Sequence, residues 1–240
     1  MKHTRLELAS GLWLDARRAV FLEESGTLAV ADLHLGYAWA HRARGNLLPI
    51  AAGDDTLLRL LELIDDYAPH DLAILGDIVH AALDAEALLG EMRALAGLAE
   101  RLPLRLIAGN HDTQLPRLLQ RAAIPLEIIR EHHAGSHLLL HGDESDEARA
   151  AARTAATHAR GGRVILGHEH PAIALSDGVT TSARCPCFLV SDDALVLPAF
   201  SAWSAGTNVR SGIFLSPYAR TARFTRAVAI VARKLLPVSL

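Results

Sequence analysis

The chain has 240 residues, of which 50% are hydrophobic and 21% charged, and its formal net charge is -3 with histidine neutral. This composition is typical of a globular protein and excludes a disordered or collagen-like chain. The slightly negative charge argues against a generally basic surface for nucleic acid, although a local basic patch stays open. No apolar run reaches the ~18 residues of a membrane helix, and the N-terminal stretch lacks a signal-peptide core. We expect a cytoplasmic protein with one domain, residues 1–240.

The apolar pattern predicts strands that alternate with helices in the first two thirds of the chain. Short apolar runs typical of buried strands lie at 27–31, 72–75, 104–108, 137–140 and 163–166. Helical spacing is found at 54–66 with Asp54 or Asp55 as N-cap, at 84–101, and at 144–160 with an alanine-rich face. Later runs at 172–175, 187–190, 194–197 and 211–215 indicate further strands. This order predicts an α/β (α+β) fold with two sheets flanked by helices.

Each of the five predicted strands in the first group is followed by a side chain that can bind a metal ion. Such positions matter because open α/β sheets build their sites beyond the carboxyl ends of strands. In an extended segment, residues two apart point the same way, so D-x-H and H-x-H can each aim two ligands at one place. The motifs are D-L-H at 32–34, G-D at 76–77, G-N-H-D at 109–112, H-G-D at 141–143 and G-H-E-H at 167–170.

Any one of these motifs is weak evidence, because a lone aspartate after a strand is usually a helix cap and a lone histidine is usually a hydrogen-bonded polar group. Their occurrence at five successive strand ends is strong evidence. With this pattern the sequence resembles the calcineurin-like metallophosphoesterase superfamily. Within it, the stretches V-A-D-L-H-L-G (30–36), L-G-D-I-V-H (75–80), G-H-E-H-P-A (167–172), P-C-F (186–188) and L-V-L-P-A-F (195–200) resemble bacterial DNA-ligase-associated metallophosphoesterases.

The resemblance implies a four-layer αββα sandwich in which two mixed β-sheets pack face to face between helices. It also implies a site for two divalent metal ions, bridged by Asp77. The first ion would be held by Asp32, His34, Asp77 and His170, and the second by Asp77, Asn110, His141 and His168. Imidazole, carboxylate and amide ligands suit Mn²⁺, Fe or Zn²⁺ better than Mg²⁺ or Ca²⁺, and we expect Mn²⁺.

Two metal ions with two aspartates leave a net positive site that attracts a phosphate oxyanion. The expected reaction is in-line hydrolysis of a phosphate ester by metal-bound hydroxide. His111 would donate a proton to the leaving-group oxygen, and Asp112 would orient the His111 ring and keep it charged. Two other interpretations of His111 stay open: it binds phosphate only in the ground state, or it caps a helix.

We expect a metal-dependent hydrolase acting on ester bonds, specifically a phosphodiesterase or nuclease linked to DNA repair. The resemblance implies DNA as substrate and a functional association with a DNA ligase and a repair nuclease or helicase. The alternative is a hydrolase of small phosphorylated metabolites, either a monoesterase or a nucleotide diesterase. A third hypothesis is an inactive binding scaffold, which need not retain its ligands, whereas every ligand is present here.

Other polar residues receive weaker interpretations. Arg42 and Arg44 could contact a substrate phosphate, and His80 either supports Asp77 or opens the next helix. Glu169 is expected to point away from the ligands. Asp143 either caps the 144–160 helix or orients a ligand. Arg149, Arg153 and Arg160 either form a solvated face or follow a DNA backbone. Cys185 and Cys187 are either small apolar side chains or a redox or metal pair.

Overall fold

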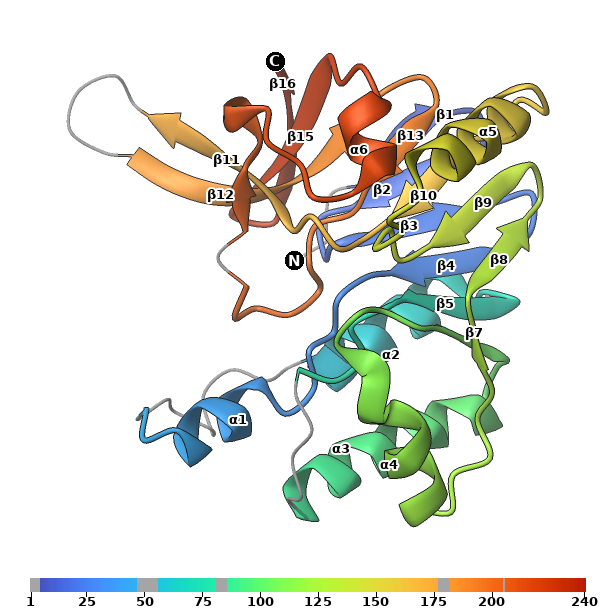
Figure 1. The fold of residues 1–240 in the computed structure, drawn as a ribbon, viewed down its shortest axis with the longest axis vertical. Helices are drawn as coiled ribbons and strands as arrows, with labels where there is room; N and C mark the ends of the chain where they lie inside the picture. The colour runs from blue at the N-terminus through green and yellow to red at the C-terminus, as the bar shows by residue number, and fades with distance from the viewer. Residues whose placement is uncertain (1–4, 47–55, 81–85, 177–181, 205) are drawn as a thin grey trace.

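The computed structural model describes residues 5–46, 56–80, 86–176, 182–204 and 206–240. In these residues the chain forms two mixed β-sheets with helices on the outer faces (Figure 1). The expected sandwich of two sheets between helices is confirmed. The N-cap predicted at Asp54 or Asp55 lies outside the described residues.

The first sheet is antiparallel in its first half and parallel in its second half. Its order is β1-β2-β3-β4-β5-β6-β7, and hairpins join the strands as far as β4. From β4 onward the strands are parallel, because a helix returns the chain to the same end each time. The strands are β1 (Arg5–Ala9), β2 (Leu12–Asp15), β3 (Ala19–Leu22), β4 (Thr27–Val30), β5 (Asp71–Leu75), β6 (Leu104–Ile107) and β7 (Ile128–Ile129).

The second sheet has the order β14-β11-β12-β13-β10-β9-β8, with β15 paired to β12 and β16 paired to β15. Its central strands β9, β10 and β13 are parallel, so their carboxyl ends lie at one edge. The strands are β8 (Glu131–Ala134), β9 (His137–Leu140), β10 (Val164–Leu166), β11 (Pro171–Ser176), β12 (Ser182–Val190), β13 (Ala194–Val196), β14 (Thr207–Asn208), β15 (Arg226–Val231) and β16 (Lys234–Ser239).

Helices cover the outer face of each sheet. The first sheet carries α2 (Thr56–Tyr67), α3 (Glu86–Gly97) and α4 (Leu115–Arg121), and the second carries α5 (Glu147–His158) and α6 (Pro217–Thr221). The short helix α1 (Tyr37–Ala43) stands away from both sheets in Figure 1. None of the described helices is long and apolar enough to cross a membrane.

The strand side chains alternate between two apolar layers, which fixes the order of the layers. Within β5, Leu72 and Ile74 pack among the helices, whereas Ala73 and Leu75 pack against the second sheet. Since every second side chain of a strand points to the same face, a one-residue slip would exchange these layers. The side chains of the central layer come from both sheets, so this layer packs the two sheets against each other.

One predicted strand is wrong and one predicted cap is misplaced. Residues 211–215 do not form a strand: Ser211 ends a 3-10 helix (Val209–Ser211), Gly212 has a left-handed φ of 66°, and Ser216 N, just after the run, donates to Glu169 at 2.5 Å. The helix predicted at 144–160 is capped by Asp146, whose carboxylate accepts from Arg149 N at 3.0 Å. Asp143 is exposed and does not cap it.

Of the two cysteines, Cys187 is buried and Cys185 is half-buried on β12, and both are free thiols. Burial raises the pKa of the Cys187 thiol to about 12, so it packs as a small neutral side chain. This favours the apolar interpretation for Cys187.

Asp15 is a buried carboxylate whose partners stabilise the fold. It accepts two side-chain hydrogen bonds from Arg17, at 2.9 and 2.7 Å, and one from the Tyr67 hydroxyl at 3.0 Å. We expect Asp15→Asn to lower the free energy of unfolding by about 2 kcal/mol, because the buried Arg17 loses its buried partner and keeps only the half-exposed Asp66, 2.7 Å from Arg17 Nη1. Urea denaturation at pH 7 measures this loss.

The same substitution should lose its effect in acid. Burial alone would raise the pKa of Asp15, but the bonds from Arg17 outweigh burial and lower it. A carboxylate with a lowered pKa contributes its stability above its unfolded pKa, and that stability is lost as the pH falls below about 4. The matched control is Asp65→Asn, because the Asp65–Arg101 pair is exposed and should contribute at most about 1 kcal/mol. Equal effects of the two substitutions at pH 7 would contradict this prediction.

Candidate metal centre

The structure brings the seven predicted metal ligands to one place, where the carboxyl edges of the two sheets meet. The sheets are joined there by a bridge between Ala31 and Ala199 and by a hydrogen bond of 3.0 Å between His141 Nδ1 and the Leu75 carbonyl. Strand ends that are distant in sequence thus display their side chains together. The ligands are Asp32 and His34 after β4, Asp77 after β5, Asn110 after β6, His141 after β9, and His168 and His170 after β10.

A first group of four side chains offers donor atoms around one point. Each of the four contributes one ligand atom, and these atoms all lie within 4.8 Å of one another. His34 Nε2 lies 3.2 Å from His170 Nε2, and His170 Nε2 lies 3.5 Å from Asp32 Oδ1. The group is Asp32, His34, Asp77 and His170, the same set that the sequence predicts for the first ion.

A second group of side chains lies around His141 Nε2. This atom is 3.1 Å from Asn110 Oδ1, 3.2 Å from His168 Nδ1 and 3.4 Å from Asp77 Oδ1. The other oxygen of Asp77, Oδ2, lies 4.0 Å from His34 Nε2 in the first group. The carboxylate of Asp77 therefore faces both groups, as a bridging ligand would.

Two of the histidines are held in place from outside the cluster. His141 Nδ1 lies 3.0 Å from the Leu75 carbonyl, so Nδ1–H donates to it and Nε2 faces the ligands. His170 Nδ1 lies 2.7 Å from Ser204 Oγ, which leaves its Nε2 for the first group. No pattern in the sequence indicates Ser204 as a site residue. It lies close to His170 because Phe200 N and Ser201 N donate to the carbonyls of Ala31 and Asp32 and hold this segment beside the cluster.

Five of the ligands have left-handed backbone conformations, which are uncommon outside glycine. Such conformations each cost about 1–3 kcal/mol and are concentrated at functional sites. Hydrogen bonds hold this backbone: Asp32 N donates to the Gly76 carbonyl at 3.2 Å, and His34 N donates to the Asp77 carbonyl at 2.8 Å. The φ angles are 56° at Asp32, 48° at His34, 47° at Asp77, 67° at His168 and 44° at His170.

Glycine is required at two of these turns for different reasons. Gly76 has a φ of 77°, and a Cβ there would lie 2.2 Å from His141 Nδ1. At Gly109 the φ is not positive, but a Cβ would lie 2.4 Å from Asp77 N and from Asp77 Oδ1. The backbone at both positions packs directly against ligands, so any side chain would push the site apart.

The protonation of these groups fits a metal site. Burial lowers the pKa of His34 to about 3 and that of His168 to about 4, so both imidazoles are neutral and keep a free lone pair at pH 7. Burial raises the pKa of Asp77 to about 6. The charge of His141 opposes this increase, and repulsion from the Asp32 carboxylate adds to it. Asp32 and Asp77 are buried carboxylates that favour cations beside them: against the effect of burial, their charges raise the pKa of His141 and His170. The nitrogen and oxygen donor set is one that divalent transition metals bind.

His111 lies at the exposed side of the cluster. Its backbone N donates to Asp77 Oδ1 at 3.0 Å, and its ring Nδ1 lies 3.1 Å from the His80 carbonyl. The ring Nε2 is left facing the site, 3.9 Å from Asp77 Oδ2. Its side chain is 44% exposed, so a substrate can reach it.

Asp112 does not orient the His111 ring as the sequence analysis expects. Its Oδ1 accepts from Val79 N at 3.1 Å and its Oδ2 accepts from Gly109 N at 2.9 Å. A buried carboxylate at the start of this turn binds the free backbone N–H groups around it, so it is not available to the exposed imidazole. Asp112 therefore fixes the turn that carries Asn110 and His111.

A row of aromatic rings, the aromatic wall, lies beside His111 and His34 and consists of His80, Tyr37 and Trp203. Of these three residues, the sequence indicates only His80. The His80 ring stacks on the His111 ring with centroids 5.8 Å apart and lies 5.4 Å from the His34 ring. Tyr37 lies 4.4 Å from His80 and stacks parallel to Trp203 at 6.0 Å. His80 thus contacts two site residues, and it precedes a segment outside the described residues rather than a described helix.

The remaining predicted residues lie at the rim or outside it. Arg42 lies in the last turn of α1 and Arg44 directly follows the helix; both are exposed and contact none of the seven ligands in the described part of the chain. The Glu169 carboxylate points away from the ligands, as expected, and anchors the loop at Ser216.

The family model described as calcineurin-like phosphoesterase matches residues 27–154, more than half of the chain. The matched segment contains the predicted ligands from Asp32 to His141. Comparison with the curated proteins gives no match.

Two solved structures are similar to this chain. The crystal structure of Pseudomonas putida nuclease MPE has a TM-score of 0.68 and 24% sequence identity, and the similarity covers 99% of this chain and 100% of that chain. Yfce, a phosphoesterase from E. coli, has a TM-score of 0.42 and 15% identity over 89% of this chain and 98% of that chain. The first similarity supports the fold, and the second is too distant to support an argument.

Proposed function

This chain belongs to the calcineurin-like phosphoesterase family, and we propose that it is a dinuclear metal-dependent phosphodiesterase that cleaves nucleic acid. The observation that carries the proposal is the placement of Asp77. One oxygen of its carboxylate faces the group around His34 and the other faces the group around His141. One carboxylate between two groups of nitrogen and oxygen donors is the arrangement that two-metal hydrolases use.

The residues of the two groups fit two divalent ions, with Mn²⁺ as the proposed metal and Fe or Zn²⁺ as alternatives. Asp32, His34, Asp77 and His170 would hold one ion, and Asp77, Asn110, His141 and His168 the other. When bound, the ions supply Lewis-acid polarisation of the phosphate and a lowered pKa for water.

The protein residues around the ions position the ester and supply the proton. His111 Nε2 faces the open side of the cluster, where the leaving group of an entering ester would lie. With its Nδ1 bound to the His80 carbonyl, the ring is fixed in an orientation that presents Nε2 to that leaving group. Asp112 contributes by holding the turn, and Ser204 and the Leu75 carbonyl contribute by fixing the imidazoles of His170 and His141.

The aromatic wall favours a nucleic acid over a small metabolite as the substrate. His80 stacks on His111, Tyr37 contacts His80, and Tyr37 stacks on Trp203, so a row of rings extends from His111, and nucleic-acid bases stack on aromatic rings. A nuclease from Pseudomonas putida has this fold, and we propose the same substrate class here. We further propose that the protein acts in DNA repair in the cytoplasm, together with a DNA ligase and a repair nuclease or helicase.

The test is a substrate panel run on the Mn²⁺-loaded protein. It contains single-stranded, nicked and duplex DNA, bis(p-nitrophenyl) phosphate and small phosphate monoesters. We expect cleavage of at least one DNA substrate, and we expect Asp77→Ala to abolish it. Turnover of a small phosphate ester without cleavage of any DNA would contradict the nuclease proposal and support the alternative, a hydrolase of small phosphorylated metabolites.

A further inference from the structure

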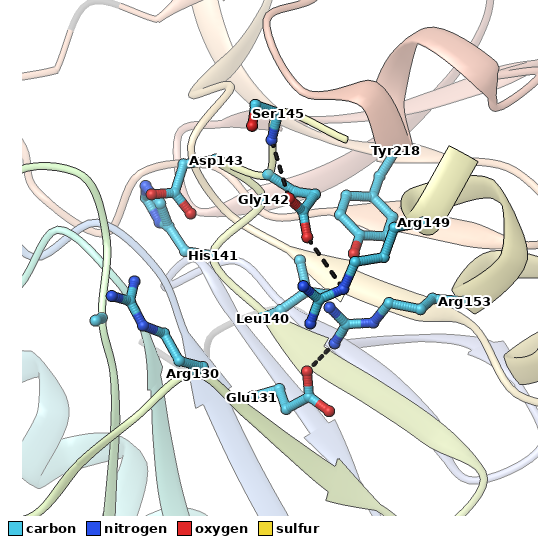
Figure 2. Close-up of a pocket in the computed structure, with 12 residues that line it drawn as sticks. Arg130, Glu131, Leu140, His141, Gly142, Asp143, Ser145, Arg149, Arg153 and Tyr218 are labelled. Atoms are coloured by element: carbon cyan, nitrogen blue, oxygen red, sulfur yellow. Dashed lines mark hydrogen bonds and ion pairs between the residues drawn. The ribbon is translucent and has the colours of Figure 1, made fainter. Parts of the chain in front are cut away.

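A polar pocket borders the metal centre at His141. It has a volume of about 310 Å³, and His141 lines both the pocket and the metal centre. Figure 2 shows guanidinium groups around it, with Arg130 on one side and Arg149 and Arg153 on the other. None of these arginines is used by the proposed reaction.

Arg149 and Arg153 lie one turn apart on α5 and point to the same side of that helix. Arg149 Nε lies 3.5 Å from Glu144 Oε2, and Arg153 Nη2 is paired with Glu131. Each of these pairs uses one nitrogen of a guanidinium that carries five N–H donors. The carboxylates therefore hold the two side chains in place while other donors remain for a ligand.

Arg130 has no hydrogen-bond or ion-pair partner among the described residues, and it is exposed. It follows β7, the last strand of the first sheet, so it approaches the pocket from the sheet opposite α5. Its full set of donors is available to a group that enters the pocket between the two sheets.

Tyr218 supplies a second, independent indication of a ligand. The residue is 1% exposed, it lines the pocket, and its hydroxyl has no hydrogen-bond partner among the described residues. A buried hydroxyl without a hydrogen-bond partner destabilises the fold unless a ligand supplies one. A ligand oxygen in the pocket would satisfy it.

The charges of the lining favour one phosphate group over a cluster of phosphates. The three arginines are balanced by Glu131, Asp143 and Glu144, so the pocket has no large surplus of positive charge. The pocket instead offers directional N–H donors. They match the oxygens of a single phosphate, and one guanidinium can bind two of these oxygens at once.

We propose that this pocket binds a phosphate of the substrate strand that neighbours the scissile phosphate. The proposal rests on the proposed function, because it requires a substrate with more than one phosphate. Arg130, Arg149 and the Tyr218 hydroxyl contact that phosphate, and the ion pair with Glu131 positions Arg153. The strand then lies with one phosphate in this pocket, the next at the metal ligands, and a base near Tyr37 and Trp203.

The test measures binding of a fluorescein-labelled single-stranded oligonucleotide by anisotropy in EDTA, so that no cleavage occurs. We expect Arg130→Gln and Arg149→Gln each to raise the Kd about tenfold and to reduce the slope of log K against log salt by about 0.7. The matched control is Arg160→Gln, because Arg160 is exposed and lies beyond α5 outside the pocket. It should leave the Kd within about twofold of wild type.

A second measurement separates substrate contact from a structural role. With Mn²⁺ present, the loss of kcat/KM in Arg130→Gln should be at least about fivefold larger for the oligonucleotide than for bis(p-nitrophenyl) phosphate, which has a single phosphate. Equal losses of kcat/KM on both substrates, or a Kd indistinguishable from that of Arg160→Gln, would contradict the phosphate-binding role of the pocket but not the proposed nuclease function. A wild-type protein that hydrolyses the small diester but neither binds nor cleaves any oligonucleotide would instead overturn the proposed function, and the pocket with it.

Discussion

Asparagine in place of Asp77 is expected to reduce kcat/KM for a DNA substrate about 1000-fold or more, equivalent to about 4 kcal/mol. The reason is geometric, since both oxygens of this carboxylate face ligand groups and the amide of asparagine offers only one oxygen. Metal analysis of the purified protein should show a decrease from two Mn²⁺ per chain to one or fewer.

The metal-free variant should nevertheless remain folded. Burial raises the pKa of Asp77 to about 6, so above that pH the metal-free wild type carries an unfavourable buried charge that asparagine removes. In EDTA at pH 7.5, Asp77→Asn should therefore unfold at a Tm equal to or above that of wild type. The control is Asp65→Asn, an exposed carboxylate on α2, which should retain both ions and full activity. Retention of two ions and normal activity by Asp77→Asn would refute the bridging role.

His111→Ala is expected to reduce kcat about 100-fold on a diester whose leaving group is a nucleoside, because such an alkoxide needs a proton as it departs. The same variant should lose less than about fivefold on bis(p-nitrophenyl) phosphate, since p-nitrophenolate leaves without protonation. The placement of Nε2 toward the open side of the cluster supports this role. Steady-state kinetics on the two substrates, with metal content checked in parallel, measure the difference.

The dependence on the leaving group separates the acid role from its alternatives. If His111 only bound phosphate in the ground state, KM would rise and both substrates would lose activity equally. His158→Ala serves as the control, because this histidine is exposed at the end of α5 and should leave both activities unchanged. A near-normal kcat of His111→Ala on the nucleoside diester, with metals bound, would exclude the acid role.

Much of the fold follows from local patterns in the sequence. The apolar runs at 72–75 and 163–166 are strands in the structure, because each is too short and too continuous for a helix and is buried on both faces. The run at 211–215, which begins with Ser211 and Gly212, is also predicted as a strand but does not form one. A 3-10 helix ends in this run and Gly212 takes a left-handed conformation, while the Glu169 carboxylate, more than forty residues away, binds Ser216 N directly after it.

The candidate site likewise contains residues that the sequence identifies and residues whose partners depend on the tertiary structure. Asp32, Asp77 and His141 could be selected from the sequence, because parallel strands bring their carboxyl ends to one edge and each residue lies within two positions of the end of such a strand. Asp112 shares its motif with Asn110 and His111, yet its partners are the backbone N–H groups of Val79 and Gly109. The local sequence does not distinguish whether the Asp112 carboxylate binds the neighbouring His111 imidazole or these backbone N–H groups.

By itself the sequence determined which residues form the strands and which polar side chains stand at their ends, since both depend on residue type and spacing along the chain. Only the tertiary structure decided that the carboxyl ends of strands from both sheets come together at Asp77, and that Ser204 supports His170. It also decided that Arg130 from one sheet faces Arg149 from the helix on the other. These contacts join residues far apart in the chain, and their geometry is fixed by the packing of the two sheets through their shared apolar layer.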